Sequence, residues 1–509
     1  MPTSGARLLR SGGVKAATTA AVALVGLASS AVLARVLDQD GLGVFALVLA
    51  MVQIGTMLAD GGSGQATTRF LAAARDDDGR RHALVAGARS RLLTTVVTVL
   101  LGAALMRWLL GALFHGQIGG GAYLWALALI AAKSLFLFAP AVARGHLDWL
   151  GEGGLLVLEA VGILFAYASL WLWPAAAATA APGAVVWRLV LAYGVLLLCL
   201  APTARRWLRQ AIATVAAAGP GPQARAQAGA APEGPVTLRR LMGFGLPLVL
   251  NSSFFLLLTW TDRVMLGIMC SPADLAVYYI AANLAGAGRM LFGIPEQVLY
   301  SHLAAGYRRG DAGLVPLHHR IFRLFAVLGA LFVVLAGAVG TFVIPLVYGG
   351  AYQASVWPFQ LLLVVLLVRV ISIPASLLLI VVHERTAETR DALAVAFVVN
   401  ILVNLLTIPR LGLVGAIVGS LVAFLVATLY LWWSLWRVAR LAASPADLLT
   451  TLGPAALWLA VVFARHHGLV PGWAAWAVQA ALAAWLLAAS LKQLAQFAKL
   501  RASAPAVGA

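Results

Sequence analysis

The chain has 509 residues, of which 62% are hydrophobic and only 11% are charged. A soluble protein of this size exposes about a quarter of its chain surface to water, so it has no way to bury this much apolar surface. The composition therefore excludes a soluble domain and predicts a protein that is solvated by lipid.

Apolar runs of about 20 residues, each long enough to cross the roughly 30 Å hydrocarbon core of a bilayer, recur along the whole chain. They are too long and too continuously apolar to be strands of a membrane barrel, so each is predicted to be a helix. The predicted fold is an all-α polytopic membrane protein. We predict fourteen transmembrane helices, at about 14–36, 41–60, 84–113, 121–143, 154–173, 184–203, 241–269, 274–300, 321–347, 356–382, 391–408, 411–436, 446–464 and 472–491.

The formal net charge of +18 is distributed unevenly between the two predicted sides of the membrane. The N-terminal tail, every second loop and the C-terminal tail together carry 27 Lys and Arg residues, whereas the opposite loops carry five. This bias follows the positive-inside rule and predicts a multi-pass protein with an even number of spans and both termini in the cytoplasm. Topology accounts for the basic charge, so no nucleic-acid partner is expected.

A long internal segment at 204–238 divides the predicted helices into six before it and eight after it. It is rich in Ala, Gly, Pro and Arg, a composition typical of a flexible cytoplasmic linker. "LGVFALVLAM" at 42–51 and "LAVYYIAANL" at 275–284 open the second helix of each half. Paired repeats are common in transporters. We therefore predict a six-helix lobe at 1–203, a second six-helix lobe at 239–440, and two accessory helices with a cytoplasmic tail at 441–509.

Motifs of catalysis are missing from the sequence. It contains no Walker A loop, no HExxH, no GxSxG and no Cys/His set with metal-ligand spacing. The predicted external loops are short, and their acidic and His residues are scattered over different loops. We therefore expect no enzymatic activity, no catalytic residues, no cofactor and no metal, although a membrane glycan polymerase or ligase remains an alternative.

Four stretches, in order, resemble one family: "LARVLDQDGLGVFALVLAMV" at 33–52, "LADGGSGQATTRFLA" at 58–72, "TDRVMLG" at 261–267 and "NILVNLLTIPRLGLVGAIVGSLVA" at 400–423. They are similar to the first helical hairpin, the turn after it, the seventh helix and the last hairpin of Wzx-type oligosaccharide (O-antigen/exopolysaccharide) flippases. These flippases belong to the MOP (multidrug/oligosaccharidyl-lipid/polysaccharide) superfamily, together with multidrug extruders (MATE) and lipid II flippases.

The resemblance implies a two-lobed carrier with a cationic cavity between the lobes. It would move undecaprenyl-diphosphate-linked oligosaccharides across the inner membrane by alternating access, for O-antigen, lipopolysaccharide or exopolysaccharide biosynthesis. The expected partners are this lipid-linked substrate, membrane lipids, and a polysaccharide polymerase or other glycan-assembly proteins. The alternatives are a lipid II flippase and a multidrug/cation antiporter. The predicted first helix at 14–36 carries no acid, which disfavours the cation-coupled alternative.

Charged residues inside predicted membrane helices are costly and often mark a transport path. We predict that Arg263, Arg289 and Arg369 bind the diphosphate or acidic sugars, because the guanidinium fork suits phosphate oxygens. Asp262 is predicted to orient Arg263, and Asp262 or Glu159 to carry a coupling proton.

Lys133 and Glu159 stand at similar depths on neighbouring predicted helices, so we predict that they pair. The alternative is that Lys133 contacts the substrate. Asn251, Asn283 and Asn400 either bind sugars or hydrogen-bond between helices.

Overall fold

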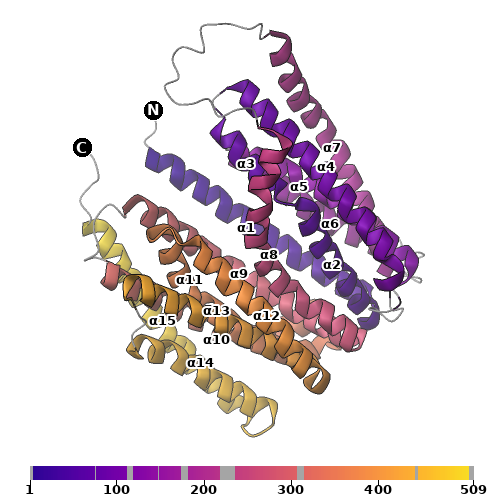
Figure 1. Cartoon of the computed structure of the whole chain (residues 1–509). Coiled ribbons are helices and arrows are strands. Elements are labelled where there is room, and N and C mark those ends of the chain that lie inside the picture. The colour runs from indigo at the N-terminus through magenta and orange to yellow at the C-terminus, as the bar shows by residue number, and fades with distance from the viewer. Residues whose placement is uncertain are drawn as a thin grey trace. The chain divides into compact units, whose positions relative to one another are not determined.

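The computed structural model describes residues 4–74, 76–109, 111, 118–146, 148–172, 182–217, 236–306, 314–441 and 445–503. Throughout these ranges the secondary structure is helical, without strands (Figure 1). The elements, in chain order, are α1 (Ser4–Val36), α2 (Gln39–Asp60), α3 (Ser63–Ala73), α4 (Asp77–Trp108), α5 (Gly120–Gly145), α6 (Trp149–Leu172), α7 (Pro182–Ala217), α8 (Leu238–Met269), α9 (Pro272–Gly306), α10 (Leu314–Tyr348), η6 (Gly350–Ser355), α11 (Val356–Leu377), η7 (Leu378–Val382), α12 (Thr386–Leu411), α13 (Leu413–Ala439), α14 (Pro445–His466) and α15 (Gly472–Ser503).

In the described part of the chain, 13 helical segments are long and apolar enough to cross a membrane. They match the predicted helices one for one, except that the predicted helix 241–269 forms α8, which is not among the 13. With its 32 residues, α8 is about 48 Å long at 1.5 Å per residue, so its length suffices to cross a bilayer. The protein is thus a multi-pass membrane protein, as its composition predicts.

The helices form two compact units, Met1–Ile268 and Met269–Ala509. The first unit contains α1 to α8 and the second contains α9 to α15. The boundary between units therefore lies after α8, whereas the sequence places a linker at 204–238, before that helix. Of this predicted linker, α7 includes the part up to Ala217, and residues 218–235 lie outside the described part of the chain.

Aspartates begin several helices by accepting a hydrogen bond from an otherwise unpaired backbone N–H. Asp38 accepts from Gly41 at 2.9 Å before α2, and Asp76 accepts from Gly79 at 2.8 Å before α4. Such a cap stabilises a helix start by about 1 kcal/mol. Asp38, the first residue of the sequence "DQDG" at 38–41, is therefore the N-cap of α2.

Two helices follow each other with only two residues between them, because α2 ends at Asp60 and α3 begins at Ser63. Gly61 and Gly62 join them in left-handed conformations, with φ of 49° and 76°. Most of the segment 61–91, which begins directly after the second predicted transmembrane helix, is helical. The segment forms α3 and the first half of α4. The polar residues of α3 make this segment resemble a loop in the sequence, although Ser63 and Thr67 are fully buried in the structure.

α3 is held against α8 by two reciprocal contacts. The guanidinium of Arg69 lies 4.2 Å from the ring centroid of Phe244, and that of Arg240 lies 5.6 Å from the ring centroid of Phe70. The two phenyl rings also pack edge to face, with centroids 5.7 Å apart. Cation–π contacts of this kind contribute about 0.5–2 kcal/mol each. The start of α8 is therefore attached to α3.

In the second unit, α10 packs against α11, α14 and α15, so the two accessory helices attach to the unit through α10. At one end of this contact Asp447, in the first turn of α14, is buried. It accepts a 2.9 Å hydrogen bond from His319 of α10 and also pairs with Arg323 of the same helix. α12 and α13 form a close hairpin, and α13 packs on α11.

The close approach of Gly62 to α8 can be tested by substitution. A Cβ on Gly62 would collide with the backbone of Gly245, and Gly62 also has a left-handed φ. We expect Gly62→Ala to destabilise the protein by at least about 2 kcal/mol, from backbone strain and overpacking together. The measurement is heat-induced loss of the monodisperse peak in detergent. Gly26→Ala is the control, because nothing lies within 4 Å of a Cβ at Gly26, in α1, and this variant should be at least as stable as the parent.

Candidate functional site

Two of the predicted cationic residues lie together in the second unit. Arg289 of α9 forms an ion pair with Glu296, seven residues further along the same helix, with 2.9 Å between Nη2 and Oε2. Arg369 of α11 lies within electrostatic range of both. Its guanidinium stacks over the ring of Phe424 from α13, 4.6 Å from the centroid. We call Arg289, Glu296 and Arg369 the α9–α11 cluster.

The α9–α11 cluster contains two cations and one anion. It therefore carries a charge of +1 when all three groups are ionised. The side chains of Arg289 and Glu296 are 26% and 35% exposed, so neither is sealed in the packed interior. A guanidinium that is partly accessible and has an acidic partner of its own can exchange that partner for a phosphate. Sequence reasoning missed Glu296 because it stands near the predicted end of its span, where an acid is unremarkable.

The third predicted cation lies in the first unit. Asp262 and Arg263 of α8 are both buried, with 1% and 4% of their surface exposed. The guanidinium of Arg263 folds back on its own helix, where Nη1 donates to the carbonyl of Thr259 at 3.3 Å and the group lies 4.1 Å from the ring centroid of Trp260. The structure thus brings Arg289 and Arg369 into one cluster and places Arg263 in the other unit.

The predicted direct pair between Lys133 and Glu159 is not formed. Lys133 donates instead to Gln53 of α2 at 3.1 Å, and Glu159 accepts a 2.5 Å hydrogen bond from the hydroxyl of Tyr193 on α7. The two charges do lie within electrostatic range of each other. The two residues are therefore near each other, but polar neighbours on α2 and α7, which spacing alone does not reveal, take the direct contacts.

The predicted asparagines occupy different environments. Asn400 of α12 is fully buried and accepts a 3.2 Å hydrogen bond from Asn404, one turn further on. This burial favours a helix-packing role over contact with a sugar. Asn283 of α9 is half-buried, and the side chain of Asn251 lies outside the described part of the structure. Binding of the substrate by these residues stays a prediction.

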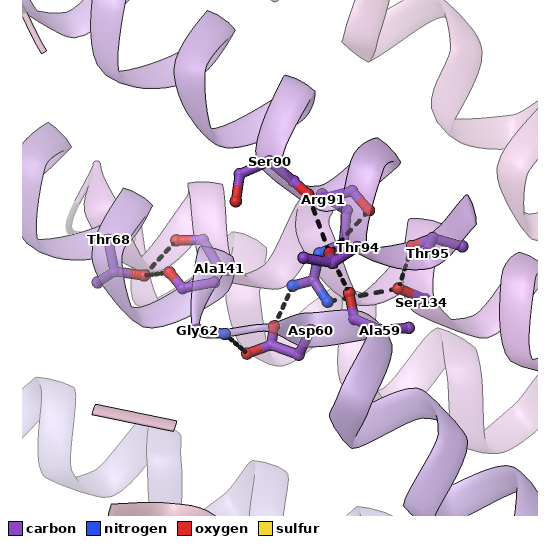
Figure 2. A network of polar contacts seen from close by, with 11 residues as sticks. Ala59, Asp60, Gly62, Thr68, Ser90, Arg91, Thr94, Thr95, Ser134 and Ala141 are labelled. Atoms are coloured by element: carbon purple, nitrogen blue, oxygen red, sulfur yellow. Dashed lines mark hydrogen bonds and ion pairs between the residues drawn. The ribbon is translucent and has the colours of Figure 1, made fainter. Parts of the chain in front are cut away.

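A polar network in the first unit, absent from the sequence-based candidates, surrounds the break between α2 and α3 (Figure 2). Its centre is an ion pair between Asp60, the last residue of α2, and Arg91 of α4. The side chain of Arg91 is only 3% exposed. The second carboxylate oxygen of Asp60 accepts from the backbone N–H of Gly62 at 3.1 Å. One aspartate therefore both neutralises a buried guanidinium and satisfies the chain where the helix is interrupted.

Hydroxyl groups extend this network to α5. Thr94 donates to the carbonyl of Ala59 at 2.6 Å, and Thr68 donates to the carbonyl of Ala141 at 2.8 Å. Arg91 donates to Ser134, which also shares a 2.9 Å hydrogen bond with Thr95 (Figure 2). Four helices thus meet at the Asp60–Arg91 pair. The signal that sequence reasoning overlooked is an acid followed by two glycines directly after an apolar run.

Some polar side-chain atoms at the contact between α3 and α4 are buried without a hydrogen bond. Four buried atoms there have no hydrogen-bond partner among the residues that the structure describes: Ser63 Oγ, Thr67 Oγ1, Ser90 Oγ and Arg91 Nε. Each buried unpaired polar atom costs about 1–3 kcal/mol. This contact therefore depends on the Asp60–Arg91 ion pair.

That dependence is testable. Asp60→Asn leaves the buried guanidinium of Arg91 without its counter-ion, and removal of one partner of a buried pair costs about 3–5 kcal/mol. We expect a lower thermal midpoint for Asp60→Asn, with partial recovery in the double variant Asp60→Asn/Arg91→Gln. The exposed pair Arg390–Asp391 provides the control, since Asp391→Asn should cost no more than about 1 kcal/mol. Equal losses at both pairs would contradict the structural role of Asp60.

Three comparisons with known proteins bear on the family. The family model described as "Polysaccharide biosynthesis protein" matches residues 8–301, which is more than half of the chain. No curated protein sequence matches significantly.

Among solved structures, the lipid II flippase MurJ in an inward closed conformation aligns over 94% of this chain and 97% of its own, with a TM-score of 0.64 and 12% identity. An inward-facing multidrug resistance MATE transporter of the MOP superfamily aligns over 82% and 95%, with a TM-score of 0.58 and 16% identity. These similarities establish a shared fold and confirm the predicted fold class. The chain belongs to the polysaccharide biosynthesis protein family and has the fold of MOP-superfamily transporters.

Proposed function

We propose that this protein is a flippase that moves undecaprenyl-diphosphate-linked oligosaccharides across the bacterial inner membrane by alternating access. The family supports a role in polysaccharide biosynthesis, and the fold supports transport rather than catalysis. The observation that carries the proposal is the α9–α11 cluster. It keeps two guanidinium groups and one carboxylate within helices that are largely apolar.

The cost of this arrangement argues for a function. A charged side chain at the centre of a bilayer costs about 2.5–3.5 kcal/mol on insertion scales. A protein that needed only a stable bundle would place apolar residues at these positions. A diphosphate headgroup, in contrast, loses its hydration on entering the membrane, and a fixed cationic surface replaces the lost hydrogen bonds. The cluster is therefore suited to an anionic lipid headgroup.

Lipid II is the second candidate cargo. The observation in its favour is the fold similarity to a lipid II flippase over 94% of the chain. Depletion of the protein in its host separates the two cargoes. The proposed function predicts loss of surface polysaccharide in cells that continue to grow, whereas arrest of cell-wall synthesis would favour lipid II. We also propose that the protein works beside a polysaccharide polymerase and other glycan-assembly proteins.

Substitution of the cluster tests the proposed function directly. We expect Arg289→Gln and Arg369→Gln each to reduce glycan export about tenfold or more, since a hydrogen bond to a charged group contributes about 1.5–3 kcal/mol. Lys at either position should retain part of the export, because the charge remains but the fork is lost. Export is measured as surface polysaccharide per cell at equal levels of membrane-inserted protein.

Arg410→Gln is the matched control, because Arg410 is exposed at the end of α12 and donates to a carbonyl of its own helix. It should leave export unchanged. Parental export by the Arg289→Gln/Arg369→Gln double variant would contradict the proposed role of the cluster.

The proposed orientation places both termini in the cytoplasm. In a background without Cys199 and Cys270, a cysteine at His467, between α14 and α15, should react with a membrane-impermeant maleimide added to spheroplasts. A cysteine at Thr386, at the start of α12, should react only after the membrane is opened. Both positions are exposed on the protein, so a difference in labelling would reflect the side of the membrane and not burial of the residue. The reverse labelling pattern would mean that the positive-inside bias has been misread.

A further inference from the structure

A proline interrupts α9 between the two members of its ion pair. Pro295 has no N–H to donate to the carbonyl of Leu291, and its ring crowds that carbonyl, so α9 loses a backbone hydrogen bond at this point. Arg289 lies six residues before Pro295 and Glu296 lies one residue after it. The Arg289–Glu296 ion pair therefore spans the weakest turn of the helix.

The two halves of α9 are held to different degrees. Every residue from Leu275 to Ala281 is buried, so the first half is surrounded on all sides. At Gly288 the backbone lies against the ring of Phe332 from α10, where an added Cβ would be 2.6 Å from the ring. From Pro295 to Tyr300, the described side chains are half-buried or exposed. Of the described side chains of α9 from Pro295 onward, only Leu303 is buried. The second half of α9 is thus packed less tightly than the stretch from Leu275 to Ala281 and is freer to move.

The geometry of the ion pair is unusual for a helix. Side chains three or four residues apart are neighbours on a helix, whereas residues seven apart lie on the same face but about 10.5 Å apart along the axis. Helical side chains generally lean toward the N-terminus. Arg289 instead reaches toward the C-terminus to place Nη2 at 2.9 Å from Glu296. A contact that extends over two turns holds the segments on either side of Pro295 together.

We propose that the Arg289–Glu296 ion pair is a brace across the Pro295 break, and that a diphosphate headgroup releases this brace by taking Arg289 as its own partner. The proposal rests on the function proposed above. A phosphate binds the guanidinium fork bidentately and repels the carboxylate of Glu296, so the bound headgroup and the closed brace exclude each other. Arg369, in electrostatic range of both residues, adds the second positive charge that favours the phosphate over the single carboxylate.

This exclusion couples cargo to conformation. A ligand shifts a conformational equilibrium only by its difference in affinity for the two states. Here that difference arises at one guanidinium, which is engaged by Glu296 in the braced state and available to phosphate in the released state. By linkage, the factor by which the brace weakens headgroup binding equals the factor by which the headgroup weakens the brace. Binding of cargo thereby loosens the half of α9 that follows Pro295.

The test uses the full-length protein in nanodiscs and pure undecaprenyl diphosphate as the probe. Hydrogen–deuterium exchange of the α9 segment 296–303 reports the brace, and exchange of segment 275–285 reports the anchored half. Without lipid, Glu296→Gln should accelerate exchange in 296–303 about threefold or more, and leave 275–285 unchanged. Saturating lipid should accelerate the same segment in the unmodified protein. Glu296→Gln should also bind the lipid about threefold or more tightly, because Arg289 no longer has a competing partner.

Two further variants keep the result interpretable. Pro295→Ala restores the backbone hydrogen bond, so exchange in 296–303 should no longer respond to lipid even though binding persists. Asp391→Asn removes the acid of an exposed ion pair on α12 and should change neither exchange nor affinity. If the unmodified protein binds undecaprenyl diphosphate but Glu296→Gln changes neither quantity, the brace is refuted and the proposed function stands. If the unmodified protein does not bind the lipid, both the release mechanism and the proposed cargo are refuted.

Discussion

A backbone in hydrocarbon has no water to bind, so every N–H and C=O within the membrane must find a partner inside the protein. This constraint explains why the described chain is helical throughout, and it also determines how the helices can be interrupted. At the end of α2, two left-handed glycines break the helix, and the carboxylate of Asp60 binds the N–H of Gly62. The same carboxylate neutralises Arg91. The irregular backbone is tolerated because it lies within packed protein, against α4, α5 and α8.

The same constraint separates the charged residues into two kinds. Asp60 and Arg91 form a pair in which the arginine is almost completely buried, and neighbouring hydroxyl groups supply further bonds. This pair holds four helices together and has little freedom to exchange partners. Arg289, Glu296 and Arg369 instead form a partly exposed group with one more cation than anions. Burial and charge balance, rather than the mere presence of charge in a span, therefore distinguish a structural pair from a candidate binding group.

The sequence was sufficient where apolar length and charge bias carry the information. The positions of 13 helices, the fold class and the joint placement of Arg289 and Arg369 in one half of the chain follow from hydropathy and counting. It was insufficient where polar residues are buried by packing. α3 has Ser, Gln, Thr or Arg at five of its 11 positions and resembles a loop, yet Ser63 and Thr67 are fully buried. Likewise, the partners of Lys133 and Glu159 come from helices about 80 and 34 residues away in the chain, and a linear pattern does not encode them.

The attachment of α3 to α8 has a consequence for the order of synthesis. α8 begins some 165 residues after α3 ends, yet its Phe244 and Arg240 provide the rings and cations that hold α3. At a translation rate of roughly 5–20 residues per second, α3 emerges about 8–33 s before its partner helix. During that interval Phe70 and Arg69 have no α8 to pack against. The first unit therefore cannot complete its packing while only α1 to α7 have been synthesised, and it becomes complete only after α8 has emerged.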